Sequence, residues 1–111
     1  MTIDPKTSQV QIEDNKIIQK FLKKHSKFET KIIKEIEDNI FTMINEKEYK
    51  IKIVKDCKYL NKIVWEYKIH LNDSLTFRVA YIIQENKVIV FFLSTTLIKA
   101  NFTQEVHRYL Q

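Results

Sequence analysis

The stretch WEYKIHLNDSLTFRVAY (65–81) carries side chains that could bind a phosphate or move a proton. Its even-numbered positions hold most of the polar groups: Glu66, Lys68, His70, Thr76 and Arg78. Lysine and arginine bind anions, and histidine exchanges protons near neutral pH. The chemistry predicted for this row of residues is therefore phosphate binding and proton transfer.

The odd-numbered positions of both halves of this stretch are apolar. Alternation with a period of two predicts two strands, 63–71 and 75–83, each with one buried and one polar face. A three-residue loop, 72–74, keeps the apolar residues of both strands on one face, whereas a two-residue loop would mix them with polar ones. The predicted register sets Lys68 opposite Arg78.

Two cations directly opposite each other on neighbouring strands repel, and an anion bound between them would relieve that repulsion. The alternative is a solvated polar face on which Glu66 neutralises a neighbour. In both cases we expect Arg78 to be exposed, so that truncating it changes stability little. Phe77, on the opposite face, is expected to lie in the core.

The elements that must position these residues follow from the remaining pattern. Helical spacing begins at Asp14, and a capping box formed by Ser26 and Glu29 predicts a second helix that ends near Asn45. The buried stripe of this second helix is expected to be Ile33, Ile36, Ile40 and Ile44.

Short β segments and a last helix complete the predicted fold. The β segments are an edge strand at 10–12, a strand at 49–53 that leads into the basic connector KDCKYLNK, and the interior strand VIVFFL (88–93). The last helix spans 101–110. These elements predict an α+β fold in which two N-terminal helices pack on a small antiparallel sheet with a short C-terminal helix.

Bulk composition restricts the functions that the chain can have. Its 111 residues predict one domain, 1–111, with a flexible tail at 1–8, and the net charge of +5 favours an acidic partner. Glycine is absent, which argues against a glycine-rich nucleotide loop and leaves positive-φ turns to Asn and Asp. One cysteine and three scattered histidines suggest no metal site, and we expect no cofactor.

The chain resembles the RelE/ParE superfamily of toxins from bacterial toxin–antitoxin systems. The resemblance rests on YKIHL (67–71), FRVAY (77–81), the turn QEN, the strand VIVFFL and the closing helix EVHRYL. In that family two N-terminal helices pack on a small antiparallel sheet. The similarity covers about residues 14–110 in layout and about 65–93 in motif.

Many RelE-like proteins are ribosome-dependent mRNA endoribonucleases that need no metal, and the resemblance implies this activity here. Cleavage through the 2′-OH needs a base, cations at the phosphoryl oxygens and an acid. By resemblance, Lys68, His70 and Arg78 are the catalytic residues. Arg78 would clamp the phosphate, Lys68 would add positive charge, and His70, where the family often has lysine, would transfer the proton.

The segment STTLIKA (94–100) departs from the family pattern. Active members usually have an arginine, a lysine pair, a tyrosine or a histidine here, whereas this chain offers Lys99 and the hydroxyl of Thr96 as RNA-binding groups. The general acid has no assigned residue. Two other functions therefore stay open: ParE-like inhibition of DNA gyrase by binding, and a non-catalytic binding domain of the same fold.

The resemblance also implies partners. One is a cognate antitoxin, whose acidic or amphipathic helix could lie on the lysine-bearing helix (16–27) or on KDCKYLNK, and the other is mRNA on the ribosome. No apolar run approaches the ~20 residues that cross a bilayer, so we expect no membrane partner and a cytoplasmic protein.

Overall fold

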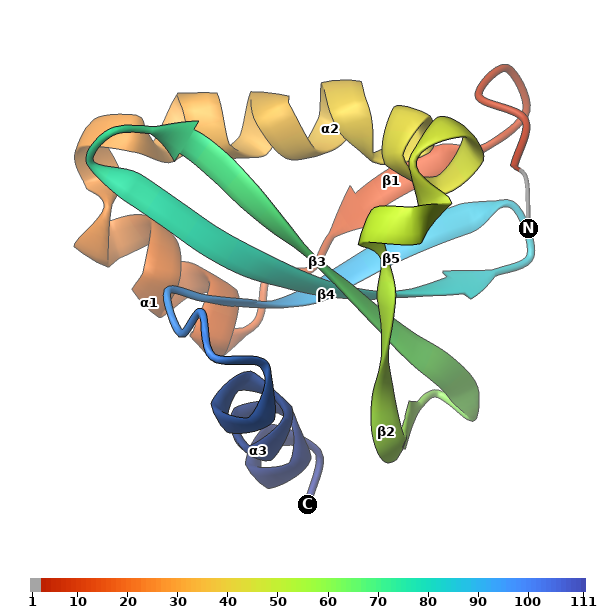
Figure 1. Cartoon of the computed structure of the whole chain (residues 1–111). Helices are drawn as coiled ribbons and strands as arrows, with labels where there is room; N and C mark the ends of the chain where they lie inside the picture. The colour runs from red at the N-terminus through yellow and green to blue at the C-terminus, as the bar shows by residue number, and fades with distance from the viewer. Residues whose placement is uncertain (1–2) are drawn as a thin grey trace.

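The computed structural model describes residues 3–111, which form a sheet with helices on both faces (Figure 1). The α-helices are α1 (Lys16–Lys24), α2 (Glu29–Glu46) and α3 (Lys99–Leu110). The strands are β1 (Gln9–Ile12), β2 (Lys52–Tyr59), β3 (Lys62–Asn72), β4 (Leu75–Gln84) and β5 (Lys87–Ser94). Short 3₁₀ turns, η1 (Ser26–Phe28) and η2 (Glu48–Lys50), precede α2 and β2.

The sheet is mixed, so the predicted small antiparallel sheet is wrong. Its strand order is β1-β5-β4-β3-β2, and β1 runs parallel to β5 with Val10 opposite Val88. The other neighbouring pairs are antiparallel. The alternating pattern of four residues shows that β1 is a strand but not which neighbour it pairs with or in which direction.

The segment expected to be a connector is itself a strand. KDCKYLNK lies in β2, in the following turn and at the start of β3, while Glu48–Lys50 forms η2 instead of the predicted strand start. Leu60 and Asn61 make the β2–β3 turn at φ values of 50° and 63°, and the β2 residue Asp56 has φ 61° beside a register shift. Such backbone usually needs glycine, so the turn and the bulge are hard to predict in a chain without it.

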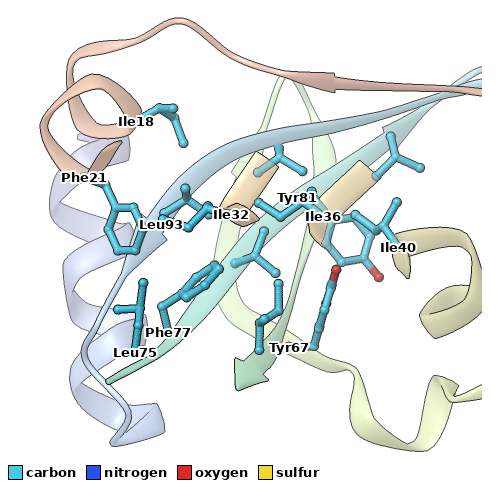
Figure 2. Packing of buried hydrophobic residues seen from close by; sticks show 14 of the residues in the cluster. Ile18, Phe21, Ile32, Ile36, Ile40, Tyr67, Leu75, Phe77, Tyr81 and Leu93 are labelled. Atoms are coloured by element: carbon cyan, nitrogen blue, oxygen red, sulfur yellow. The ribbon is translucent and has the colours of Figure 1, made fainter. Parts of the chain in front are cut away.

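Helices α1 and α2 cover one face of the sheet (Figure 2). The buried stripe of α2 is Ile32, Ile36, Ile40 and Ile44, so the predicted Ile33 is replaced by its neighbour. Phe21 of α1 packs against Phe77 of β4, with ring centroids 5.2 Å apart. The predicted burial of Phe77 is confirmed, because its side chain is 0% exposed.

Helix α3 covers part of the opposite face. Phe102 and Val106 are fully buried there with Phe91 and Phe92 of β5. The strand 88–93 is therefore covered on both faces, as its unbroken apolar run predicts.

The helix ends differ in part from the predicted ones. Asn15 caps α1 by accepting a hydrogen bond from the Ile18 N–H at 2.9 Å, whereas Phe28 precedes α2 without a side-chain cap. The predicted capping box at Ser26 is wrong, because this residue opens η1. The first two residues of the predicted tail lie outside the described residues, and Ile3 is held by two hydrogen bonds to Asn45.

Candidate functional site

The β3–β4 hairpin has the predicted pairing over most of its length. Lys68 lies opposite Arg78, and His70 lies opposite Thr76. The loop differs, because Asn72 pairs with Leu75 after a register shift beyond His70. This shift brings the strands back to the predicted register although the turn contains two residues instead of three.

Lys68 and His70 are exposed on the polar side of β3. The Nδ1 atom of His70 is 2.8 Å from the Thr76 hydroxyl oxygen, and its Nε2 atom is 3.9 Å from an Asp73 carboxylate oxygen. The imidazole is thus oriented by one cross-strand contact and open to solvent on its other side. Lys68 and His70 are therefore both accessible on the same face of β3.

Arg78 lies in the same row but is not a free cation. Its Nη1 donates to both carboxylate oxygens of Glu66, at 3.1 and 3.2 Å. Its Nε and Nη2 donate to the carbonyl oxygen of Leu97, at 3.0 and 2.8 Å. The side chain is only 15% exposed, so the expectation of an exposed Arg78 is wrong.

Glu66 is the acidic partner of Arg78, as in the alternative in which Glu66 neutralises a neighbour, but the pair is buried instead of solvated. It is a charged residue buried at 0% exposure, and this burial raises the pKa of its carboxyl group, while Arg78 and Lys99 act in the opposite direction. The sequence contains a signal for this role, because Glu66 shares the polar row with Arg78. The complete burial of Glu66 depends on tertiary packing, which the alternation of polar and apolar residues does not predict.

The segment after β5 is tied to α3 through Glu105. The Ser94 hydroxyl donates to Glu105 at 2.7 Å, and the Thr96 hydroxyl donates to the other oxygen of the same carboxylate. The Thr96 N–H donates to the Ser94 hydroxyl oxygen at 3.1 Å. The hydroxyl of Thr96, predicted to bind RNA, therefore has an internal acceptor.

Lys99 is half-buried at the first position of α3, near enough to Glu66 to favour the ionised carboxylate. Its charge therefore acts on the same internal anion as Arg78. Of the five predicted site residues, Lys68 and His70 are exposed together, Arg78 and Thr96 are hydrogen-bonded to internal carboxylates, and Lys99 acts on Glu66 through its charge. Glu66, Glu105 and the Leu97 carbonyl were not among the predicted site residues.

Two further observations bear on the type of site. Within residues 3–111, no group of three or more His, Cys, Asp or Glu side chains is arranged to hold a metal ion. Among the helices of the same residues, none has the length and apolarity needed to span a membrane. Comparison of the chain with models of protein families, with curated proteins and with solved structures gave no match.

Proposed function

We propose that this protein is a bacterial toxin of the RelE/ParE kind that stops growth by binding its target rather than by cutting RNA. The supporting observation is the engagement of Arg78, whose Nε, Nη1 and Nη2 atoms all have acceptors inside the chain. A phosphate would have to compete with the buried carboxylate of Glu66 for this guanidinium. Charge-assisted pairs of this kind are strong and geometrically specific.

The groups that remain available suit binding. Lys68 and His70 are exposed at one end of β3, and the chain carries a net charge of +5. ParE-like proteins inhibit DNA gyrase by binding it, so the resemblance favours gyrase as the target and the cytoplasm as the compartment. A cognate antitoxin would then neutralise the protein.

A second candidate function, a metal-independent mRNA endoribonuclease acting on the ribosome, is favoured by the geometry at His70. Its contact with the Thr76 hydroxyl orients the ring, and the exposed Lys68 lies two residues away on the same face of β3. A histidine beside a cation can transfer a proton while the cation stabilises charge on the phosphate. In this mechanism Lys68 and His70 carry the chemistry, and Arg78 positions the strand.

The two functions are separated by testing the purified protein in two assays, DNA supercoiling by gyrase and cell-free translation with mapping of mRNA ends. We expect loss of supercoiling with intact mRNA. Cleaved mRNA with normal supercoiling would reject the binding mechanism in favour of the nuclease. A protein that is inactive in both assays and does not slow growth would reject the toxin proposal and favour a non-catalytic binding domain.

Variants of the exposed pair show whether the candidate site is used. The double change Lys68→Ala and His70→Ala should weaken growth inhibition about tenfold, which corresponds to about 1.4 kcal/mol of lost binding. The matched control is Lys20→Ala with Lys24→Ala, which removes two exposed cations from α1. Equal inhibition by both double variants would place the target-binding surface elsewhere.

A further inference from the structure

The helical layer on the α2 side ends before the sheet does. Trp65 of β3 lies opposite Ile53 of β2 and Tyr81 of β4, so these side chains share the face that α2 partly covers. Tyr81 is buried, but Ile53 is 39% exposed and Ile63, two residues before Trp65, is 46% exposed. In Figure 1 the β2–β3 hairpin extends beyond the helices that cover the rest of this face.

Two neighbouring depressions lie on this uncovered surface and share Trp65 and Ile83. One, of about 240 Å³, also includes Ile44 and Ile51 near the end of α2. The other, of about 410 Å³, reaches Ile63 and the lysines of the hairpin. Because they share two residues, we treat them as one apolar groove, the hairpin groove, which runs from the end of α2 to the β2–β3 turn.

The outer rim of the hairpin groove, near the β2–β3 turn, is basic. Lys58 and Lys62 line its outer part, whereas Glu48 lines the inner part beside α2. Asp56 is the only acidic residue of β2. An apolar floor with a positively charged rim is complementary to a segment that carries one apolar stripe between acidic side chains.

We propose that the hairpin groove binds an acidic amphipathic helix of a partner protein. Such a helix would lie in the same layer as α2 and would cover the exposed isoleucines, as a helix does when it buries its apolar stripe on a sheet. Two copies of this chain meeting through the groove would bring their lysines together, which disfavours self-association. If the proposed toxin function is correct, this partner is the antitoxin, although the groove itself does not depend on that function.

Trp65 reports directly on the groove, because it is the only tryptophan in the chain and lines both depressions. The probe is a synthetic amphipathic helix of leucine and glutamate, and the control probe has lysine in place of glutamate. We expect the acidic helix to shift Trp65 emission to shorter wavelength and to bind more weakly as salt increases. No binding, or equal binding of the lysine helix, would overturn the proposal.

Variants locate the binding surface. Ile63→Asp should weaken binding of the acidic helix about tenfold or more, as expected when an apolar contact in the groove is replaced by a charge. The control is Ile98→Asp at an isoleucine that is 65% exposed in the β5–α3 connection, at the opposite end of the sheet from the β2–β3 turn (Figure 1). Ile63→Thr keeps a β-branched side chain and serves as a second variant if Ile63→Asp does not fold.

The basic rim is tested by Lys58→Glu with Lys62→Glu, against Lys20→Glu with Lys24→Glu on α1. Only the first pair of changes should weaken binding of the acidic helix. An equal effect of both pairs would show that the helix responds to the net charge of the protein and not to the groove, and would overturn the proposal. Sedimentation must show a monomer, because a dimer that Ile63→Asp abolishes would make a second copy the occupant and overturn it too. Growth inhibition is measured separately from peptide binding. A variant that loses peptide binding but stays toxic therefore tests the groove and not the proposed toxin function.

Discussion

Replacing Arg78 with alanine should destabilise the protein strongly, although arginine is usually a surface residue. The guanidinium is the hydrogen-bond partner of a carboxylate that is completely buried, and it also holds the Leu97 carbonyl before α3. Arg78→Ala leaves Glu66 buried without this partner. The variant therefore tests whether Arg78 is internal to the fold or a free cation of the polar row.

The size of the effect follows from the environment of Glu66. Removing one partner of a buried ion pair typically costs about 3–5 kcal/mol. The low end applies here, because Arg78 keeps 15% of its side chain exposed and because Lys99 and Lys52 also favour the ionised carboxylate. We therefore expect a loss of about 3 kcal/mol, against about 0.5 kcal/mol or less for an ordinary surface change.

Urea denaturation followed by circular dichroism measures this loss. With an m-value of about 1.5 kcal/mol/M, a loss of 3 kcal/mol lowers the midpoint by about 2 M. Lys68→Ala is the matched control, because Lys68 lies directly opposite Arg78 but is exposed. The double change Glu66→Leu with Arg78→Met should recover much of the stability, since it removes both charges.

The pH dependence of the Arg78→Ala variant gives a second measure. Loss of the cation raises the pKa of Glu66 further above its unfolded value, so the folded variant binds a proton more readily than the unfolded chain. The deficit relative to the parent should therefore shrink as the pH falls from 8 to 5. An Arg78→Ala protein within about 0.5 kcal/mol of the parent at pH 7 would refute the buried ion pair.

Two further variants test the core and the half-buried His25. Phe77→Ala should lower the free energy of unfolding by about 3–5 kcal/mol, because it truncates a fully buried ring, and a loss below about 1 kcal/mol would contradict the packing against Phe21. Burial and Lys24 lower the pKa of His25 below its ordinary value of 6.5, and its Nε2 has no hydrogen-bond partner among the described residues. Unfolded His25 then binds a proton more readily than folded His25, so the parent should lose stability as the pH falls below 6.5, and His25→Phe should lose less. Thermal melting at pH 7.5 and 5.5 measures this loss, and an equal fall in melting temperature for the two proteins would contradict the prediction.

Periodicity predicted the elements whose residues have strongly different faces. The pairing of Lys68 with Arg78 was confirmed because only one register keeps the apolar residues of both strands on the helix-covered side. The interior strand and the last helix were confirmed for the same reason, since burial on both faces or on one stripe leaves a clear pattern. The shift by one residue from Ile33 to Ile32 shows the limit of the method, because two adjacent isoleucines fit a helical stripe almost equally well.

The wrong predictions concern pairing and backbone that the local pattern does not specify. The direction of β1 depends on where the chain returns after the helices, and four residues with half-buried alternate positions fit either direction. The prediction ended the strand at residue 53 and made the rest of β2 a connector, because the lysines of KDCKYLNK interrupt the alternation, and a bulge at Asp56 lies in the same segment. Its strand conformation depends on pairing with β3, which overrides local preference.

The candidate site shows why a row of polar residues does not by itself identify a catalytic face. Alternation places Glu66, Lys68 and Arg78 on one side of the hairpin, but it does not tell which of them other parts of the chain will cover. Leu97 follows β5, and its carbonyl reaches Arg78 only because the chain folds back before α3. The same arginine is a phosphate clamp if that side is open and a structural ion pair if it is closed. Because it is closed here, the search for a target should begin from Lys68 and His70, the two site residues that the fold leaves exposed together.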